Sequence, residues 1–529
     1  MTLQEGPRDS DALAFIAQSL ERGQLTHEEV ERLKKTAARL FGLGRFPSNS
    51  EILSAVSSSM RGQVEEVLKV HPRRSASGIV VVTAFSAPYS CPHGTCVFCP
   101  GGPRFGTPQS YLPESPGMAA ALELNFSPSA QVERSLAKYR ANGHPTDKVE
   151  TIIEGGTFLA VPAEYQVSFV KGVFEGLNGH PSSSLASAQS SNEEARSRCV
   201  GLTLETKPDW CGPQDADLML EYGVTRVELG VQTLRDETLS KANRGHTVAD
   251  AVEAMRVARD AGLKVAVHMM PGLPGAYPDE DLKDLRRLFE DPDYRPDMMK
   301  VYPTLVVPGT ALARQFEAGL FVPYGLETVV ELLSEMKRAI PSWHRIMRIQ
   351  REIPEREISG GVNKGNLRQL VLQRATRKGI SCRCIRCREV ALDEPEALEE
   401  DDSLRYSEQR YEASGGTEVF GSYEFKRSGR IAGFVRARIP SPRAHRAEAS
   451  GSLIVRELRV YGRALEIGGR DSRAWQHSGL GSSLMGIAEA LAREQGARRV
   501  LVTSAVGTRN YYRKLGYERL GPYMAKSVV

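Results

Sequence analysis

Three cysteines lie close together in the segment CPHGTCVFC, at Cys91, Cys96 and Cys99. Three thiolates on one tight loop could bind three irons of a 4Fe–4S cluster and leave the fourth iron open for a small molecule. Zinc is the alternative, because it prefers four ligands in a closed site and His93 could supply the fourth. The position favours iron and sulfur: the loop follows an apolar run, and active sites of parallel barrels lie at the carboxyl ends of strands.

A second group of cysteines, Cys382, Cys384 and Cys387, stands in the segment SCRCIRCRE. Its spacing suits a structural zinc ion if a fourth ligand comes from elsewhere, and the alternative is three reduced thiols without a metal. In a reducing compartment, such clustering indicates metal rather than disulfides. Cys199 and Cys211 stand apart, and we expect them in the core because a free cysteine behaves as a small hydrophobe.

A glycine-containing segment, QHSGLG at 476–481, lies between an expected strand and an expected helix. Glycines let the backbone approach a pyrophosphate, whose charge the N–H groups of a helix N-terminus can bind, whereas a plain turn is the usual alternative. The preceding run IVRELRVYG and the closing run VGTRNYYRKLGYE both resemble the GNAT acetyltransferase fold. That resemblance implies acetyl-CoA as the ligand.

The same resemblance implies a role for each part of this region. The backbone of 458–460 would pair with the pantetheine arm, 480–483 would cradle the pyrophosphate, and Tyr512 would act near the thioester. Tyr511 and Tyr517 are expected in the core instead. The acetyl-CoA site is thus expected at Glu457, Leu458, Arg459, Val460, Gln476, Gly479, Leu480, Gly481, Ser482, Ser483 and Tyr512.

The elements that must position these residues follow from the hydrophobic pattern. Continuous apolar runs, typical of strands buried on both faces of a parallel sheet, are separated by amphipathic stretches typical of helices. Alternating strands and helices predict a full or partial parallel barrel. The runs lie at 78–85, 149–156, 200–206, 225–232, 264–270 and 298–304, and the helical stretches at 163–177, 212–222, 248–262, 279–290 and 326–339.

Four regions are expected, because 529 residues exceed what one hydrophobic core usually supports. Residues 1–75 would form a helical RNA-binding appendage or packing partner, and 76–340 the barrel, interrupted by a disordered serine-rich loop at 181–198. Residues 341–400 would be a basic linker with an acidic tail, and 401–529 a compact α/β domain. Its strands are expected near 417–424, 430–438, 452–460 and 499–504, and a helix at 479–495.

The distribution of charge is more informative than the net charge of +4. Between Lys337 and Arg388 there are 14 Lys and Arg against 3 acids, and 7 acids follow within 393–402. The basic block, with Trp343 inside it, could contact nucleic-acid phosphates, and a solvated helical face is the equal alternative. No run approaches the roughly 20 apolar residues that cross a bilayer, and the first residues lack a secretory pattern, so we expect a cytoplasmic protein.

Several motifs in one order resemble the family of the catalytic subunit of Elongator, in its single-chain bacterial or archaeal form. They are CPHGTCVFCPGG with four and then two residues between cysteines, GGTF at 155–158, ETKPD at 205–209, ELGVQ at 228–232, NRGHT at 243–247, HMMPGLPG at 268–275, YPTLV at 302–306 and GVNKGNLR at 361–368. The resemblance implies an α/β fold in which a radical S-adenosylmethionine (SAM) partial barrel is joined to a C-terminal GNAT domain, with a small N-terminal helical region.

It also implies site residues. Cys91, Cys96 and Cys99 would hold the 4Fe–4S cluster, and Lys148 would bind acetyl-CoA and take part in catalysis. The residues that would face SAM are Gly155, Gly156, Glu205 and Gln232. For the two glycines, a simple turn is the alternative.

The implied reaction uses both cofactors on a tRNA. A radical derived from SAM would take a hydrogen atom from the acetyl methyl group, and the resulting carbon radical would add to carbon 5 of the wobble uridine in the anticodon arm. Loss of an electron and a proton, together with hydrolysis of the thioester, would leave 5-carboxymethyluridine. The electron donor is not identified, and Elongator-type partners are possible but not required. The alternatives are a protein lysine acetyltransferase with the barrel as scaffold, and a non-catalytic tRNA-binding scaffold, which the intact cysteine triad disfavours.

Overall fold

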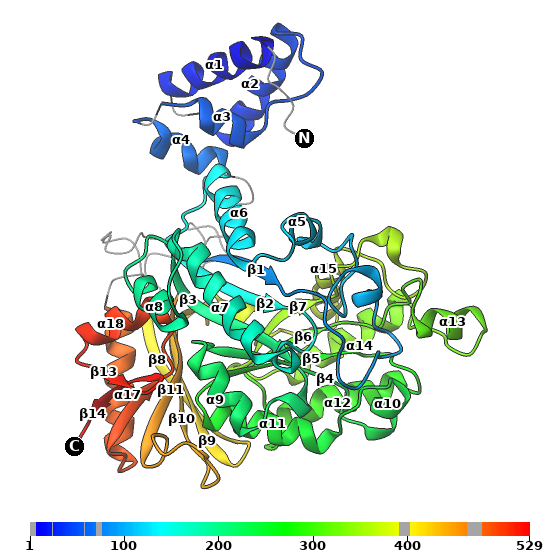
Figure 1. The fold of residues 1–529 in the computed structure, drawn as a ribbon, viewed down its shortest axis with the longest axis vertical. Helices are drawn as coiled ribbons and strands as arrows, with labels where there is room; N and C mark the ends of the chain where they lie inside the picture. The colour runs from blue at the N-terminus through cyan, green and yellow to red at the C-terminus, as the bar shows by residue number, and fades with distance from the viewer. Residues whose placement is uncertain (1–6, 24, 58, 70–76, 391–402, 463–478) are drawn as a thin grey trace.

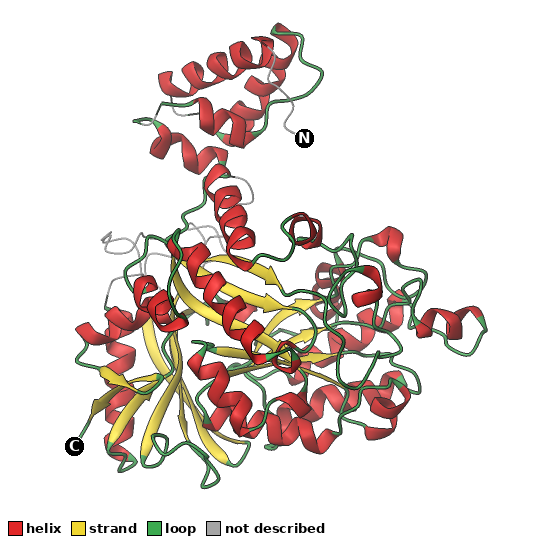
Figure 2. Ribbon diagram, in the orientation of Figure 1, coloured by secondary structure: helices red, strands yellow, loops and turns green. Residues whose placement is uncertain are grey.

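The computed structural model describes residues 7–23, 25–57, 59–69, 77–390, 403–462 and 479–529. A helical unit stands on helix α6 at one end of the molecule, and two sheets lie side by side beneath it (Figure 1). Helices line the outside of the first sheet (Figure 2). The expected acidic tail at 393–402 and the expected site residue Gln476 lie outside the described residues.

The N-terminal unit confirms the expected helical region. Side chains of Thr26 and Ser48 cap the second and third helices by accepting from backbone N–H groups three residues on, which is why the chain turns helical there. Residues such as Ile16, Val30 and Ile52 form a separate small core. The helices are α1 (Pro7–Arg22), α2 (His27–Leu40), α3 (Asn49–Ala55) and α4 (Arg61–Leu68).

The first sheet is the expected partial barrel. Among the described residues, seven parallel strands pair in sequence order, so the sheet is wound in one direction and its first and last strands are edges. The strands are β1 (Val80–Phe85), β2 (Lys148–Glu154), β3 (Arg198–Thr206), β4 (Arg226–Gln232), β5 (Lys264–Met269), β6 (Met298–Val301) and β7 (Arg345–Ile349). Every residue of β4 is buried, as the continuous apolar runs predicted.

Helices connect these strands. The five expected helical stretches are confirmed, and their ends agree with the structure to within two residues. The helices are α5 (Met118–Glu123), α6 (Pro128–Ala141), α7 (Ala163–Asn178), α8 (Leu185–Asn192), α9 (Pro213–Glu221), α10 (Asp236–Lys241), α11 (Val248–Asp260), α12 (Pro278–Glu290), α13 (Ala311–Glu317), α14 (Leu326–Ala339), α15 (Leu367–Arg377) and α16 (Ile385–Arg388).

Two expectations are wrong. The serine-rich segment 181–198 is not a disordered loop but contains α8, because Ser184 and Ser187 form a capping box and the buried Asn192 bonds to the backbone N–H of Cys199 at 2.8 Å. The basic block is not a helical face throughout, because β7 lies within it and pairs with β6. The sheet therefore continues beyond residue 340, where the sequence analysis ended the barrel.

The second sheet confirms the expected α/β domain. Its described strands are β8 (Leu404–Ala413), β9 (Gly416–Phe425), β10 (Ile431–Ile439), β11 (Ser452–Val460), β12 (Arg499–Val502), β13 (Glu518–Leu520) and β14 (Tyr523–Ser527), in the order β13-β14-β12-β11-β10-β9-β8. Helices α17 (Leu480–Glu494) and α18 (Arg509–Lys514) belong to this domain. The sequence analysis missed β8, β13 and β14.

Alternate residues of β11 belong to two different cores. Leu453 and Val455 pack with α17, whereas Ile454 belongs to the large core that includes the barrel. The approach is close: a Cβ added at Gly262, in the turn after α11, would lie 2.9 Å from Ile454 Cγ2. The barrel and the C-terminal domain therefore share one continuous interior.

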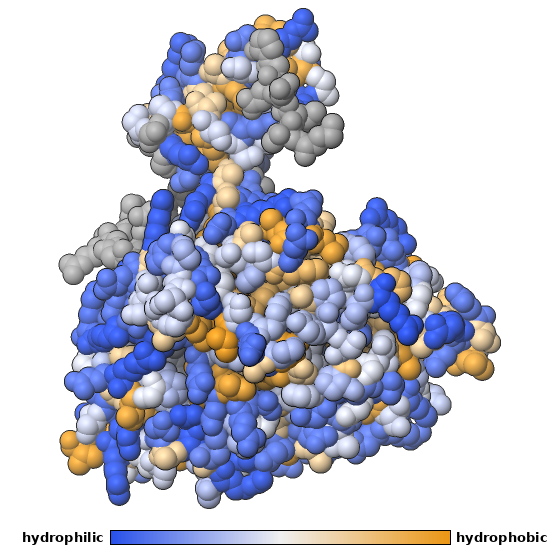
Figure 3. Space-filling view, viewed as in Figure 1, coloured by the Kyte–Doolittle hydropathy of each residue, from blue (hydrophilic) through white to orange (hydrophobic). Residues whose placement is uncertain are grey.

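Hydrophilic side chains predominate on the face shown in Figure 3, with hydrophobic residues in small groups. None of the helices among the described residues has the length and apolarity that crossing a bilayer requires.

Candidate active sites and the cavity between them

The first cysteine group lies where the sequence analysis placed it, in the loop that follows β1 at the carboxyl edge of the barrel sheet. Cys96 and Cys99 are buried and Cys91 is half-buried. All three line one cavity of about 80 Å³, together with Gly156, Glu205 and Gln232. The structure thus brings the expected metal ligands together with three of the four residues expected to face SAM.

This cavity fits a cluster and its ligand in two ways. Gly156 has a φ of +77°, and a Cβ there would lie 3.2 Å from Gln109 Cβ and 3.6 Å from Cys91 Sγ, so glycine keeps the space beside the thiol open. Gln232, also in the left-handed region at φ 73°, has a buried Oε1 without a partner among the described residues. Burial raises the pKa of Cys99 to about 11, so this thiol ionises on binding a metal rather than alone.

Gly155 has a different role. Its φ is +154°, and a Cβ would lie 1.9 Å from Ser86 Oγ, so the glycine is needed for close packing of the β1 and β2 ends. The turn alternative therefore describes Gly155 well, whereas Gly156 faces the cysteines.

Ionisable side chains fill the interior of the barrel beyond the cysteines. Lys300 Nζ lies 2.5 Å from Glu228 and 3.3 Å from Glu205, and His268 Nε2 lies 2.8 Å from Glu228. The Tyr111 hydroxyl donates to Glu205 at 3.1 Å. The carboxylates of Glu205 and Glu228 and the imidazole of His268 are close enough together to hold a metal ion. The buried ammonium group of Lys300, however, already supplies a positive charge beside them. Of this network only Glu205 was predicted as a site residue. Glu228 and His268 stand in two of the quoted motifs, ELGVQ and HMMPGLPG, whereas Tyr111 lies in none of them.

The series of ion pairs in the barrel interior continues toward the C-terminal domain. Arg226 pairs with Glu228 at 3.3 Å and with Glu150, and Arg459 on β11 reaches Glu150 at 3.5 Å. A cavity of about 1740 Å³ extends along these ion pairs. Its lining includes Glu205, Gln232 and Arg244 from the cysteine end, Glu457 and Arg459 from β11, and Tyr461 directly after that strand. One hollow therefore joins the cysteine site to the strand expected to bind the pantetheine arm.

The expected acetyl-CoA residues that are described lie around one opening in the second sheet. β12 pairs only with Ser452–Val455 of β11, so the edge of β11 from Leu458 to Val460 is left without that neighbour. Helix α17 begins beside it: Gly479, its N-cap, has a φ of 90°, and a Cβ at Gly481 would lie 3.9 Å from Val460 Cγ2. An extended ligand could pair with this strand edge, and the N–H groups at the start of α17 could bind a pyrophosphate.

The tyrosines of α18 differ from expectation in one respect. Tyr512 is buried and packs in the core of the second sheet, and Tyr517 is buried with its hydroxyl 3.0 Å from Glu489. Tyr511 was expected in the core but is 38% exposed, and a Cβ at Gly481 would lie 2.6 Å from its hydroxyl. Tyr511 therefore borders the start of α17, because successive residues of a short helix point to different sides.

Lys148 begins β2 at the opposite end of the barrel from the cysteines. Burial lowers its pKa. It is paired with Arg198, which packs against Gly507 shortly before α18, and Glu193 of α8 binds Arg509 at 3.1 Å. The seven residues of β2 place Lys148 about 20 Å from Glu154 at the cysteine end.

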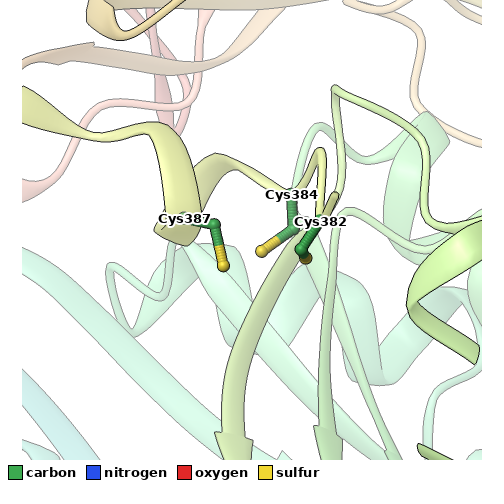
Figure 4. Close-up of side chains that lie close together, drawn as sticks. All are labelled: Cys382, Cys384 and Cys387. Carbon is green, nitrogen blue, oxygen red and sulfur yellow. The ribbon is translucent and has the colours of Figure 1, made fainter. Parts of the chain in front are cut away.

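The second cysteine group converges in space. The sulfur atoms of Cys382, Cys384 and Cys387 lie within 4.8 Å of one another and point toward a common centre (Figure 4). Lys337 Nζ lies 3.4 Å from Cys382 Sγ. No fourth metal-binding side chain joins them among the described residues. Cys199 and Cys211 are fully buried in the core, as expected.

The residues of the basic block have different surroundings in the structure. Trp343 is buried and stacks on Tyr411 with centroids 4.3 Å apart, so it offers no face to a nucleic acid. Arg345 binds Glu389 at 2.5 Å, and Arg374 pairs with acids of α14. The arginines of the basic block that line the large cavity are Arg345, Arg348, Arg351, Arg368 and Arg386.

Family models divide the chain in the same way. An ELP3 N-terminal domain matches residues 10–76, the radical SAM superfamily 87–289, a Radical_SAM C-terminal domain 296–377 and the acetyltransferase (GNAT) family 385–517. These matches support the sequence-based resemblance over nearly the whole chain.

Similar proteins extend over the same length. A tRNA uridine(34) acetyltransferase of Methanocaldococcus jannaschii is 42% identical over 95% of this chain and 94% of its own, and Elongator complex protein 3 of Homo sapiens is 38% identical over 98% and 96%. The solved structure of archaeal Methanocaldococcus infernus Elp3 with an N-terminal deletion has a TM-score of 0.75 at 41% identity, covering 85% of this chain and 99% of that one. The chain belongs to the family of tRNA uridine(34) acetyltransferases and Elongator complex protein 3.

Proposed function

We propose that this chain modifies the wobble uridine of tRNA to 5-carboxymethyluridine, with acetyl-CoA as the carbon source. The observation that carries the proposal is the cavity that joins the cysteine site to β11. Two separate cofactor sites on one chain need a shared space if they serve one reaction, and this cavity supplies it.

Cys91, Cys96 and Cys99 would hold a 4Fe–4S cluster in the smaller cavity, with Gly156 and Gln232 beside the bound SAM. When bound, cluster and SAM supply the radical that takes a hydrogen atom from the acetyl methyl group. The chain's part is to orient the reacting atoms and exclude water. Lys300 and Glu205, held by Glu228 and Tyr111, fix the polar floor of the site.

Acetyl-CoA would lie in the opening between β11 and β12, with its pyrophosphate at the start of α17 and Tyr512 near the thioester. Lys148 is assigned to the same ligand because β2 starts beside the segment that leads into α18. The charged interior between Arg459 and Glu205 would then carry the acetyl group toward the cluster.

The anticodon arm of a tRNA would enter the open side of the partial barrel. Arg134 and Lys138 of α6 line one rim of the large cavity, and Arg348, Arg351 and Arg386 line the other. Lysine and arginine neutralise phosphates, and an unpaired anticodon base can be turned into a pocket. The N-terminal unit stands above α6, so it would extend this basic path along the tRNA (Figure 1). Partner subunits are not required by this arrangement.

We assign a structural zinc ion to Cys382, Cys384 and Cys387. The three soft sulfur ligands already converge as tetrahedral zinc requires. Ile385 between them packs with Trp343 of the barrel and Phe420 of the second sheet, so the metal would lock the junction of the two domains.

The decisive test incubates cluster-reconstituted protein anaerobically with reductant, SAM, acetyl-CoA and unmodified tRNA, followed by mass spectrometry of the nucleosides. We expect carboxymethyluridine from the native chain and none from Cys96→Ala. Arg351→Ala should retain SAM cleavage while tRNA affinity falls. The proposal fails if SAM is cleaved but no tRNA yields the modified uridine, and acetylation of a protein lysine instead would favour the acetyltransferase alternative.

A further inference from the structure

One short segment after α10, residues 242–245, contacts the loop that carries the first cysteine group. The Val97 N–H donates to Ala242 O at 3.1 Å, and Asn243 Nδ2 donates to Thr95 O at 2.8 Å. The next two residues continue the contact. Arg244 reaches Cys96, and a Cβ at Gly245 would lie 2.5 Å from His93 Cβ.

Arg244 is a buried cation without a carboxylate partner among the described residues. It is 7% exposed, its Nη2 donates to Gly230 O at 2.7 Å, and its Nη1 lies 3.2 Å from Cys96 Sγ. Its Nε has no partner there. Burying a guanidinium is costly unless an anion compensates its charge. Arg226, another buried arginine of the barrel, instead pairs with the carboxylates of Glu150 and Glu228.

His93 approaches the same sulfur from the other side. Its Nε2 lies 3.2 Å from Cys96 Sγ, whereas Nδ1 is buried and has no partner among the described residues. With Nδ1 as the lone pair, Nε2 carries the hydrogen and donates to sulfur. The ring is confined by Gly245, which cannot accept a side chain at that place. Four residues between Cys91 and Cys96 provide the length for this ring to fold back.

We propose that Arg244 and His93 donate hydrogen bonds to the Cys96 thiolate and thereby raise the reduction potential of the cluster. Reduction adds one negative charge to the cluster. A positive charge and two donors at one ligand stabilise the reduced form more than the oxidised form. The missing counter-charge of Arg244 is then the cluster itself. The inference rests on the cluster proposed at these cysteines, and not on the reaction with tRNA.

The test is a potentiometric titration of the reconstituted full chain, followed by electron paramagnetic resonance of the reduced cluster, without SAM, acetyl-CoA or tRNA. We compare Arg244→Met and His93→Phe with the native chain after matching iron and sulfide content. The control is Lys207→Met, which removes a buried cation of the same cavity that pairs with Asp209 at 3.0 Å. In the part of the chain that the structure describes, Lys207 donates to Asp209 and not to a cysteine sulfur, so its substitution isolates the effect of charge alone.

At the midpoint potential of the native chain, the ratio of reduced to oxidised cluster should fall about tenfold in Arg244→Met, which is ~59 mV for one electron. His93→Phe should shift it in the same direction by less, and Lys207→Met least of all. An unchanged potential in iron-loaded Arg244→Met overturns the proposal, as does an equal shift in Lys207→Met. If Arg244→Met cannot retain iron, His93→Phe decides alone.

A second measurement, the dissociation constant for SAM, tests a different role for Arg244. If Arg244→Met keeps its potential while the dissociation constant for SAM rises, Arg244 binds the carboxylate of SAM and the proposal is wrong. Failure of the native chain to form any cluster would instead count against the proposed function, so the two failures are distinguishable.

Discussion

Glu154 shows how the barrel interior changes the chemistry of a single residue. It ends β2 in the large cavity, where burial and the neighbouring Glu205 carboxylate raise its pKa to about 8. Glu150, on the same inward row of β2, has its pKa lowered to about 2: burial raises it, but Arg226 and Arg459 outweigh that effect. Two carboxyl groups on one strand therefore differ in charge at neutral pH because one has cations beside it.

We predict that Glu154→Gln makes the stability of the folded chain less sensitive to a rise in pH between about 4.5 and 8. Between the unfolded value of 4.5 and about 8, the folded protein binds a proton at Glu154 that the unfolded chain has lost, so stability falls as pH rises. The loss is at most about 1.4 kcal/mol per pH unit. Thermal unfolding from pH 5 to 9 should show a steeper decline for the native chain than for Glu154→Gln. Parallel curves would contradict the raised pKa.

Gly156 makes a second residue-scale prediction. Gly156→Ala adds a methyl group 3.6 Å from Cys91 Sγ in a backbone conformation with φ +77°, so iron content after reconstitution should fall at least several-fold. The matched control is Gly179→Ala at the end of α7, which has the same φ and nothing within 4 Å. Both variants should lose about 1 kcal/mol of stability through backbone strain. Equal iron content in the two would show that Gly156 does not shape the cluster site.

At the scale of elements, the second cysteine group lies where α16 contacts both the barrel sheet and the second sheet. Helix α16 contacts β7, the Ile385 N–H donates to His344 O at 2.9 Å, and Arg388 pairs with Glu424 of β9 at 3.1 Å. Glu389 forms a bridge with Ile431 of β10. A metal at Cys384 would hold this short helix between the two sheets.

We predict that Cys384→Ser lowers the amount of bound zinc and weakens the packing of α16 between the two sheets, without removing the 4Fe–4S cluster. Loss of a structural metal ligand destabilises by several kcal/mol because binding energy is folding energy. Elemental analysis should report less zinc, and the unfolding temperature should fall. Cys199→Ser is the control, since that buried thiol belongs to neither group. Unchanged metal content in Cys384→Ser would mean that the three thiols hold no zinc.

How far the sequence predicts these elements depends on what their side chains face. Each of the first six barrel strands contains enough apolar and β-branched residues to stand out as a run, and all were predicted. β7 was missed because Arg345 and Arg348 point into a polar cavity and break the apolar run. Helix α8 was missed because its serines, typical of loops, serve here as caps. The cysteines were predicted from spacing, but Arg244 and Lys300 could not be, since only the folded sheet brings them to the site.

At the scale of the whole molecule, buried ion pairs join the barrel to the second sheet. Arg456 forms two contacts of 2.7 Å with Asp297, and Arg438 lies 2.7 Å from Asp260. Glu418 binds both arginines, and none of these five side chains is exposed. Charges without access to water can exchange partners only at high cost. The barrel and the second sheet are therefore held in one orientation, so that under the proposed function the acetyl group would move through the cavity rather than by domain rotation.

Asp297→Asn should weaken this connection strongly. Burial raises the pKa of Asp297, but Arg456 holds it well below the ordinary value, so its stabilising effect is present above about pH 4 and is lost as pH falls. Removing the charge leaves Arg456 with Glu418 alone and should cost about 3–5 kcal/mol. The control is Arg443→Met, which removes an exposed pair with Glu253 that spans the same two domains and should cost about 0–1 kcal/mol. Calorimetry of both variants at pH 7 measures the difference. If tRNA-dependent acetyl-CoA hydrolysis and stability survive Asp297→Asn unchanged, the fixed orientation comes from apolar packing across β11 and not from the ion pairs.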